Sequence, residues 1–175
     1  WLARDELDQL FGLIDGLWSL HEAKGWYHSA IEVTKDILGV LEGSGRSSAF
    51  AAEELTLRTG LARALMAIGG YNAEVESALT RALELAEASG TTAQEIPVLR
   101  ALASIYVQRT SWDASTTIGR QLIDLGERAH NQLLQAEGHY VIAVSSLFTD
   151  PRGAASELDQ AISLFGSKPP SSERF

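Results

Sequence analysis

The sequence predicts an all-α fold, an α-solenoid of about four antiparallel helix pairs. Apolar residues recur every three or four positions along most of the 175 residues, which is the period of amphipathic helices and not the alternation of strands. Short stretches of Gly or small polar residues interrupt this period, and after each one a helix follows with a small residue near its start. Such self-similarity indicates stacked helical hairpins, because one hairpin cannot bury its apolar face without a neighbour.

The first two helix pairs are expected over residues 3–43 and 50–89. A helix over residues 4–23 opens the first pair, because its apolar residues have helical spacing. The Gly/Ser-rich stretch from Gly43 to Ser48 predicts a link between the pairs. Gly69-Gly70-Tyr71 predicts the turn inside the second pair, since Gly tolerates the left-handed conformation that ends many helices.

The last two helix pairs are expected over residues 92–130 and 132–166. Thr92 and Glu95 have the spacing of a capping box, in which side chains satisfy the unpaired amides at a helix start. Asp150-Pro151-Arg152-Gly153 has the composition of a tight turn and is expected to separate the two helices of the fourth pair.

One helical repeat domain is therefore predicted over residues 1–166. Residues 167–175 contain a Pro pair and are predicted as a tail or as a linker to a following segment. Because the chain begins with Trp1 and not with Met, we expect it to be a piece of a longer protein.

Each second helix is expected to carry a small side chain near its start, because a larger one would hold the two helices of a pair apart. These predicted small positions are Ala30, Ala78, Ser115 and Ala155. Aromatic residues precede three of them and would fill the wedge between pairs: Tyr27, Tyr71 and Trp112. Burying one such ring stabilises the fold by about 1.5–3 kcal/mol. The fourth pair has Arg152 in this place, which predicts a weaker wedge there.

Composition narrows the classes of partner. The chain has 23 acidic and 14 basic residues and a formal charge of −9, which disfavours nucleic acid, because phosphate-backbone binders depend on clustered Lys and Arg. It has no cysteine, which excludes disulfides and thiolate chemistry and is typical of a reducing compartment. No apolar run approaches the roughly 20 residues that cross a bilayer. We therefore expect a cytoplasmic protein with neither nucleic acid nor membrane as partner.

Motifs of catalysis and metal binding are missing from the sequence. The four histidines form no His-Glu-x-x-His pattern, and acidic pairs such as Glu53-Glu54 lie near expected helix starts, where the helix dipole favours carboxylates. The stretch from Gly43 to Ser48 lacks the lysine of a nucleotide-binding loop and follows a helix, not a strand. We expect no metal, no cofactor and no catalytic residues in this segment, and an enzyme in its own right remains only a remote alternative.

Several stretches resemble tetratricopeptide repeats. Leu17, Gly25, Tyr27 and Ala30 match the large, turn, aromatic and small positions of one repeat, although Trp18 stands where a small residue is usual. The segments 69–86, 120–129 and 158–165 resemble the tetratricopeptide-like arm of large bacterial signalling ATPases, regulators of the STAND type that are sometimes fused to adenylate or guanylate cyclase domains. The resemblance covers about residues 10–165 and only the arm, since the nucleotide-binding and cyclase motifs are absent.

This resemblance implies a right-handed superhelix and a function. The chain would be a non-enzymatic protein-interaction or sensor arm of a larger signal-transduction or transcription-regulatory ATPase. It would bind a protein partner or the regulatory domain of its own parent protein, and the exposed ends of a stack could also pair two copies into a homodimer. The alternative is a receptor domain that binds a small-molecule inducer in its concave groove.

In tetratricopeptide arrays the first helix of each pair lines the concave groove. The resemblance then implies the following groove residues, in order of the four pairs: Asp15, Ser19 and Glu22; Thr59, Arg63 and Met66; Arg100, Ser104 and Gln108; Glu137, Tyr140 and Phe148. The two arginines could hold a peptide or a small ligand, since guanidinium groups bind carboxylates in bidentate fashion. For each residue, an ordinary solvated side chain is the alternative.

Overall fold

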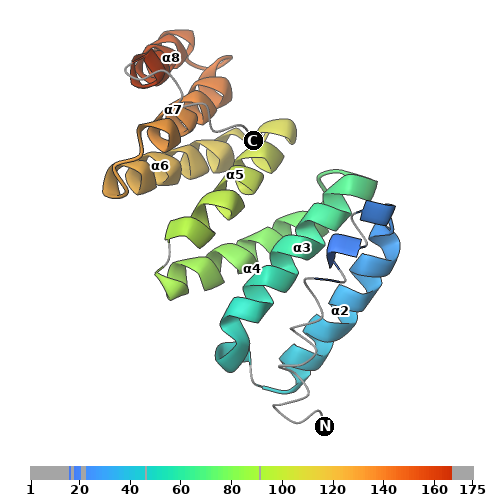
Figure 1. Cartoon of the computed structure of the whole chain (residues 1–175). Coiled ribbons are helices and arrows are strands. Elements are labelled where there is room, and N and C mark those ends of the chain that lie inside the picture. The colour runs from blue at the N-terminus through green and yellow to red at the C-terminus, as the bar shows by residue number, and fades with distance from the viewer. Residues whose placement is uncertain (1–15, 17, 21–22, 46, 91, 167–175) are drawn as a thin grey trace. The chain divides into compact units, whose positions relative to one another are not determined.

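The computed structural model describes residues 16, 18–20, 23–45, 47–90 and 92–166, and over these residues it is all-α (Figure 1). The elements are α2 Tyr27–Gly43, the 3-10 turn η1 Ser47–Phe50, α3 Ala51–Gly69, α4 Ala73–Ser89, α5 Thr92–Gln108, α6 Trp112–Arg128, α7 Gln132–Ser146 and α8 Pro151–Gly166. Most of the expected helix over residues 4–23 lies outside the described residues, but residues 16, 18–20 and 23–24 are helical.

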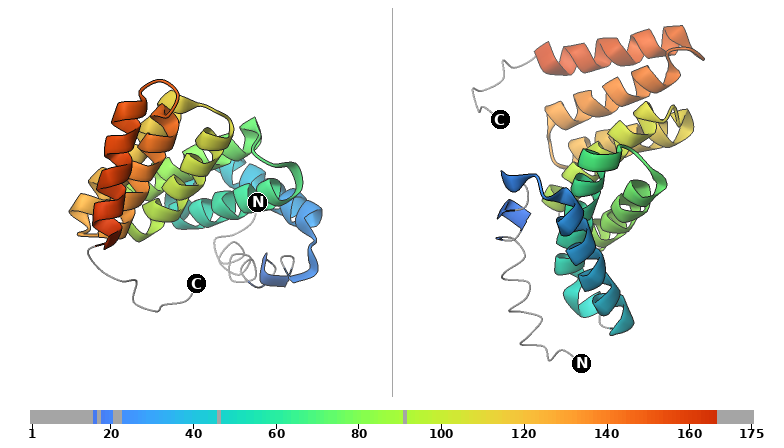
Figure 2. Two further views of the ribbon diagram at one scale, coloured as in Figure 1. Left: turned by 90° about the horizontal axis from the view of Figure 1, so that it is seen from above. Right: turned by 90° about the vertical axis from the view of Figure 1, so that its right-hand side faces the viewer.

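The chain divides into two compact units, Trp1–Gly90 and Thr91–Phe175. In the first unit α2 packs against α3, and α3 packs against both η1 and α4. In the second unit α5 packs against α6, α6 against α7, and α7 against α8; the right-hand view of Figure 2 shows α7 between α6 and α8. Helices that follow one another in sequence thus pack side by side within each unit, which confirms the all-α, solenoid-like prediction.

The chain turns between α3 and α4 at residues 70–72, where the sequence predicts a turn. Gly70 has a φ of 72°, in the left-handed region that glycine adopts at no steric cost. The Asn72 side chain then caps α4, because its Oδ1 accepts hydrogen bonds from the backbone amides of Glu74 and Val75, each at 3.0 Å. Such a cap satisfies amides that have no partner inside the helix.

A buried carboxylate ties α3 to α4. Only 1% of the Glu54 side chain is exposed, and its Oε1 accepts hydrogen bonds from Arg58 Nε at 2.8 Å and from Arg81 Nε at 3.1 Å. Burial raises the pKa of Glu54, but the hydrogen bonds and charges of Arg81 and Arg58 outweigh it and hold the pKa below its usual value. Glu54 also lies in the first turn of α3, where the helix dipole favours a carboxylate.

Glycines allow the backbones of α6 and α7 to come into direct contact. A Cβ atom on Gly138 of α7 would lie 2.5 Å from the carbonyl oxygen of Gly119 in α6, and one on Gly119 would lie 3.0 Å from the carbonyl oxygen of Gly138. A Cβ on Gly126 would meet the backbone nitrogen of Gln135 at 2.8 Å. No residue larger than glycine fits at these three positions without moving the helices apart.

Three of the four predicted small positions are buried: Ala30, Ala78 and Ser115. The fourth prediction is wrong, because Ala155 is exposed and Ala154 is fully buried instead. The reason is where the helix begins: α8 starts at Pro151 and α6 at Trp112, so Ala154 and Ser115 are each the fourth residue of their helix. Pro151, and not Arg152, therefore occupies the place of Trp112.

Candidate interaction surfaces of the second unit

The groove residues predicted in the first unit are only partly described. Asp15 and Glu22 lie outside the described residues, and Ser19 is exposed on a short helical stretch. Thr59, Arg63 and Met66 all lie on α3, four and three residues apart, which places them on one helix face. Arg63 is exposed, and the other two are half-buried.

In the second unit the structure brings two predicted groove residues together. Arg100 of α5 and Glu137 of α7 form a bidentate ion pair, with Nε to Oε2 at 2.6 Å and Nη2 to Oε1 at 2.8 Å. The carboxylate that Arg100 was expected to bind in a ligand is thus supplied by the chain itself, and a ligand would have to displace Glu137. Ser104 and Gln108 are exposed on α5, and the Ser104 hydroxyl donates to the Arg100 carbonyl at 3.0 Å.

Tyr140 and Phe148, the last two predicted groove residues, are separated by the structure. Tyr140 lies on α7, whereas Phe148 lies beyond the end of α7 in the turn before α8 and is 82% exposed. Tyr140 lines an apolar groove between α7 and α8, and Phe148 does not line it.

This α7–α8 groove has a volume of about 640 Å³. Ala136 of α7 and Ala161 of α8 are buried beneath it. Larger apolar side chains line the rest of the groove: Tyr140 of α7, and Leu158, Ile162 and Phe165 of α8. Glu137 and Gly166 complete the lining. Tyr140 is 57% exposed, Ile162 66% and Phe165 55%. The sequence pattern marked these α8 residues as apolar and helical, but it gave them no functional role.

The exposure of these α8 side chains stands out when α8 is compared with α6. Matching the first residues of the two helices places Leu158, Ile162 and Phe165 opposite Gly119, Ile123 and Gly126. Those α6 residues are the ones that meet α7: Gly119 and Ile123 lie at Gly138, and Gly126 lies at Gln135. Among the residues that the structure describes, a helix covers this face of α6 and none covers the same face of α8.

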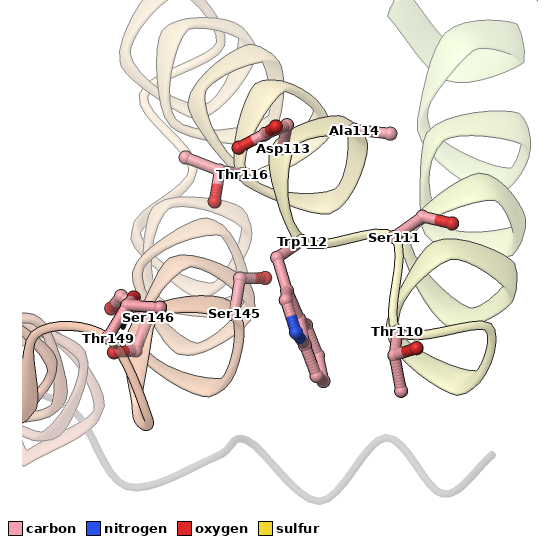
Figure 3. Close-up of a pocket in the computed structure, with 9 residues that line it drawn as sticks. All are labelled: Thr110, Ser111, Trp112, Asp113, Ala114, Thr116, Ser145, Ser146 and Thr149. Carbon is pink, nitrogen blue, oxygen red and sulfur yellow. Dashed lines mark hydrogen bonds between the residues drawn. The ribbon is translucent and has the colours of Figure 1, made fainter.

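A second, more polar hollow of about 540 Å³ lies between the start of α6 and the end of α7. In Figure 3 the Trp112 ring lies between Thr110 on one side and Ser145, Ser146 and Thr149 on the other. The hydroxyls of Ser146 and Thr149 donate to backbone carbonyls, at 2.9 Å and 3.2 Å. Each of these hydroxyl oxygens keeps lone pairs that can accept a hydrogen bond.

The part of the chain that the structure describes holds no group of three or more His, Asp or Glu side chains placed to bind a metal ion. None of its helices combines the length and the hydropathy needed to cross a bilayer.

No family model matches this chain, and comparisons with curated proteins and with solved structures give no match either. A function must therefore be inferred from the α7–α8 groove and the Trp112 pocket.

Proposed function

We propose that this chain is a non-enzymatic interaction arm that docks another protein on the α7–α8 groove. One observation carries the proposal: α8 exposes large apolar side chains at the positions where α6 is covered by α7. With about 200 Å² for a large side chain, the exposed fractions of Tyr140, Leu158, Ile162 and Phe165 leave about 400 Å² of apolar surface. The largest apolar patch of a monomer has about this size and is often functional, whereas single exposed apolar residues are ordinary.

The resemblance to the arms of bacterial signalling ATPases suggests who the partner is. In that case the chain is a cytoplasmic sensor arm, and the groove docks a separate signalling protein or the regulatory core of the parent protein. Docking would bias such a core between a resting and an active state, provided that the groove binds the two states with different affinity.

The absence of cysteine from the chain allows a direct test. Single-cysteine variants are made at Ile162, in the groove, and at Phe148, exposed outside it. The rate of maleimide labelling is then compared between dilute purified protein and cells of the source species. We expect protection in cells of about tenfold or more at Ile162→Cys, which corresponds to a docking free energy of at least about 1.4 kcal/mol. Phe148→Cys should label equally in both. Equal labelling of both variants in cells would contradict the proposal.

The Trp112 pocket favours a second candidate function, a receptor for a small-molecule inducer. Its volume of about 540 Å³ lies within the range of roughly 300–1,000 Å³ found for ligand sites. An inducer at about 100 times its Kd should stabilise the chain by about 2.7 kcal/mol in a thermal-shift screen. Trp112→Ala should abolish that shift and leave the labelling of Ile162→Cys unchanged. A shift that survives Trp112→Ala would rule out this pocket.

A further inference from the structure

We propose that the occupant of the α7–α8 groove is a basic amphipathic helix of the partner protein. This inference rests on the proposed function and names the chemistry of the docked segment. Two observations carry it: the way α7 covers α6, and the charge around the groove.

The chain itself shows what covers this kind of surface. On α6, the face made by Gly119, Ile123 and Gly126 receives one helix, α7. The α8 residues in the same places, Leu158, Ile162 and Phe165, follow one another at intervals of four and three. A single row with this spacing matches the side-chain rows of one docked helix. The alanines beneath the groove leave room for apolar side chains of that helix to enter.

The charge around the groove selects a basic helix. Residues 132–166, from α7 to α8, contain Glu137, Asp150, Glu157 and Asp159 but only one arginine or lysine, Arg152. Glu137 lines the groove and is paired with Arg100 of α5, whereas Glu157 and Asp159 flank Leu158 in sequence. Glu157 contacts His139 at 2.7 Å, and Asp159 is exposed. The net charge of α7 and α8 is therefore acidic, and it attracts Lys or Arg on a docked helix and repels Glu or Asp.

A model peptide tests the inference with the whole chain. The probe is a fluorescein-labelled peptide of about 15 residues, with Leu every three or four positions and Lys elsewhere, so that it forms a basic amphipathic helix on binding. Fluorescence anisotropy should show binding that weakens as salt is added, because added salt screens charge attraction. Ile162→Asp should raise the Kd at least about tenfold. Phe148→Asp, which makes the same charge change outside the groove, should leave the Kd unchanged, and circular dichroism checks that both variants are folded.

Each contrary result has a distinct meaning. Equal affinity of the wild type and Ile162→Asp would overturn the groove as the site. Equal affinity for a peptide with Glu in place of Lys would overturn the basic character of the occupant. If sedimentation shows a dimer that Ile162→Asp dissociates and the peptide does not, the occupant is a second copy. Protection of Ile162→Cys in cells without peptide binding would refute the basic helix and leave the proposed function standing, whereas loss of both would refute both.

Discussion

Replacing Gly138 by alanine should destabilise the second unit, although alanine is the better helix former. The new Cβ would lie 2.5 Å from the Gly119 carbonyl oxygen, and 2.7 Å from Cγ1 and 2.9 Å from the backbone nitrogen of Ile123. Ordinary contacts need about 3.5 Å, so α6 and α7 must separate by up to about 1 Å and lose part of their dispersion energy. Overpacking costs about 1–3 kcal/mol, and we expect the upper end here, because backbone atoms cannot rotate away.

The gain in helix propensity, about 1 kcal/mol, leaves a net destabilisation of about 2 kcal/mol. Gly39→Ala is the matched control: Gly39 lies inside α2 with nothing within 4 Å of its would-be Cβ, so alanine there should stabilise by about 0.5–1 kcal/mol. Native-state hydrogen exchange read by mass spectrometry reports each unit separately. If α6 and α7 of Gly138→Ala exchange as slowly as in the wild type, the close backbone contact is not formed.

Three further perturbations test other contacts. The lowered pKa of Glu54 means that its ion pairs stabilise the first unit above the unfolded pKa, and that this stabilisation is lost as the pH falls through the folded pKa. The free energy of unfolding should therefore fall with acid less steeply in Glu54→Gln than in the wild type, and equal slopes would refute this. Ala154→Trp should lower the free energy of unfolding by at least about 1–3 kcal/mol and Ala155→Trp by far less; similar urea midpoints would mean that the α8 register is wrong. Arg100→Glu should cost about 1 kcal/mol, because the pair with Glu137 is partly exposed to solvent, and adding Glu137→Arg should restore the loss in a double-mutant cycle.

The elements of the fold could be predicted from local sequence. Helical spacing and turn chemistry at Gly70 and Asp150–Gly153 depend only on neighbouring residues, and the structure has helix ends at both places. The residue at which a helix begins is harder to predict from local sequence. The predicted small position of α8, Ala155, is one residue too late, because the turn composition of Asp150–Gly153 includes Pro151, which is the first residue of α8.

The contacts between helices could not be predicted in the same way. Taken one helix at a time, Gly119 and Gly138 only lower helix propensity. Their role in close packing is visible only where α6 contacts α7. The bidentate pair of Arg100 and Glu137 joins residues 37 positions apart, and both were assigned to a groove without a sign that they bind one another. An apolar row such as that of α8 predicts burial, but spacing alone does not tell which surface covers it.

The glycine contact between α6 and α7 also limits how this unit could lengthen. Repeat proteins are built of hairpins that each contact only their neighbours in the stack, so an inserted hairpin must rebuild the contacts that it separates. A hairpin inserted between α6 and α7 would separate the backbones of Gly119 and Gly138. To restore equally close contacts with α6 and with α7, each of its helices would need a glycine that faces Gly119 or Gly138. A hairpin added after α8 would break no contact among the described residues and would cover Leu158, Ile162 and Phe165. The second unit can therefore be extended beyond α8 more easily than between α6 and α7, on the same face that we propose as a docking surface.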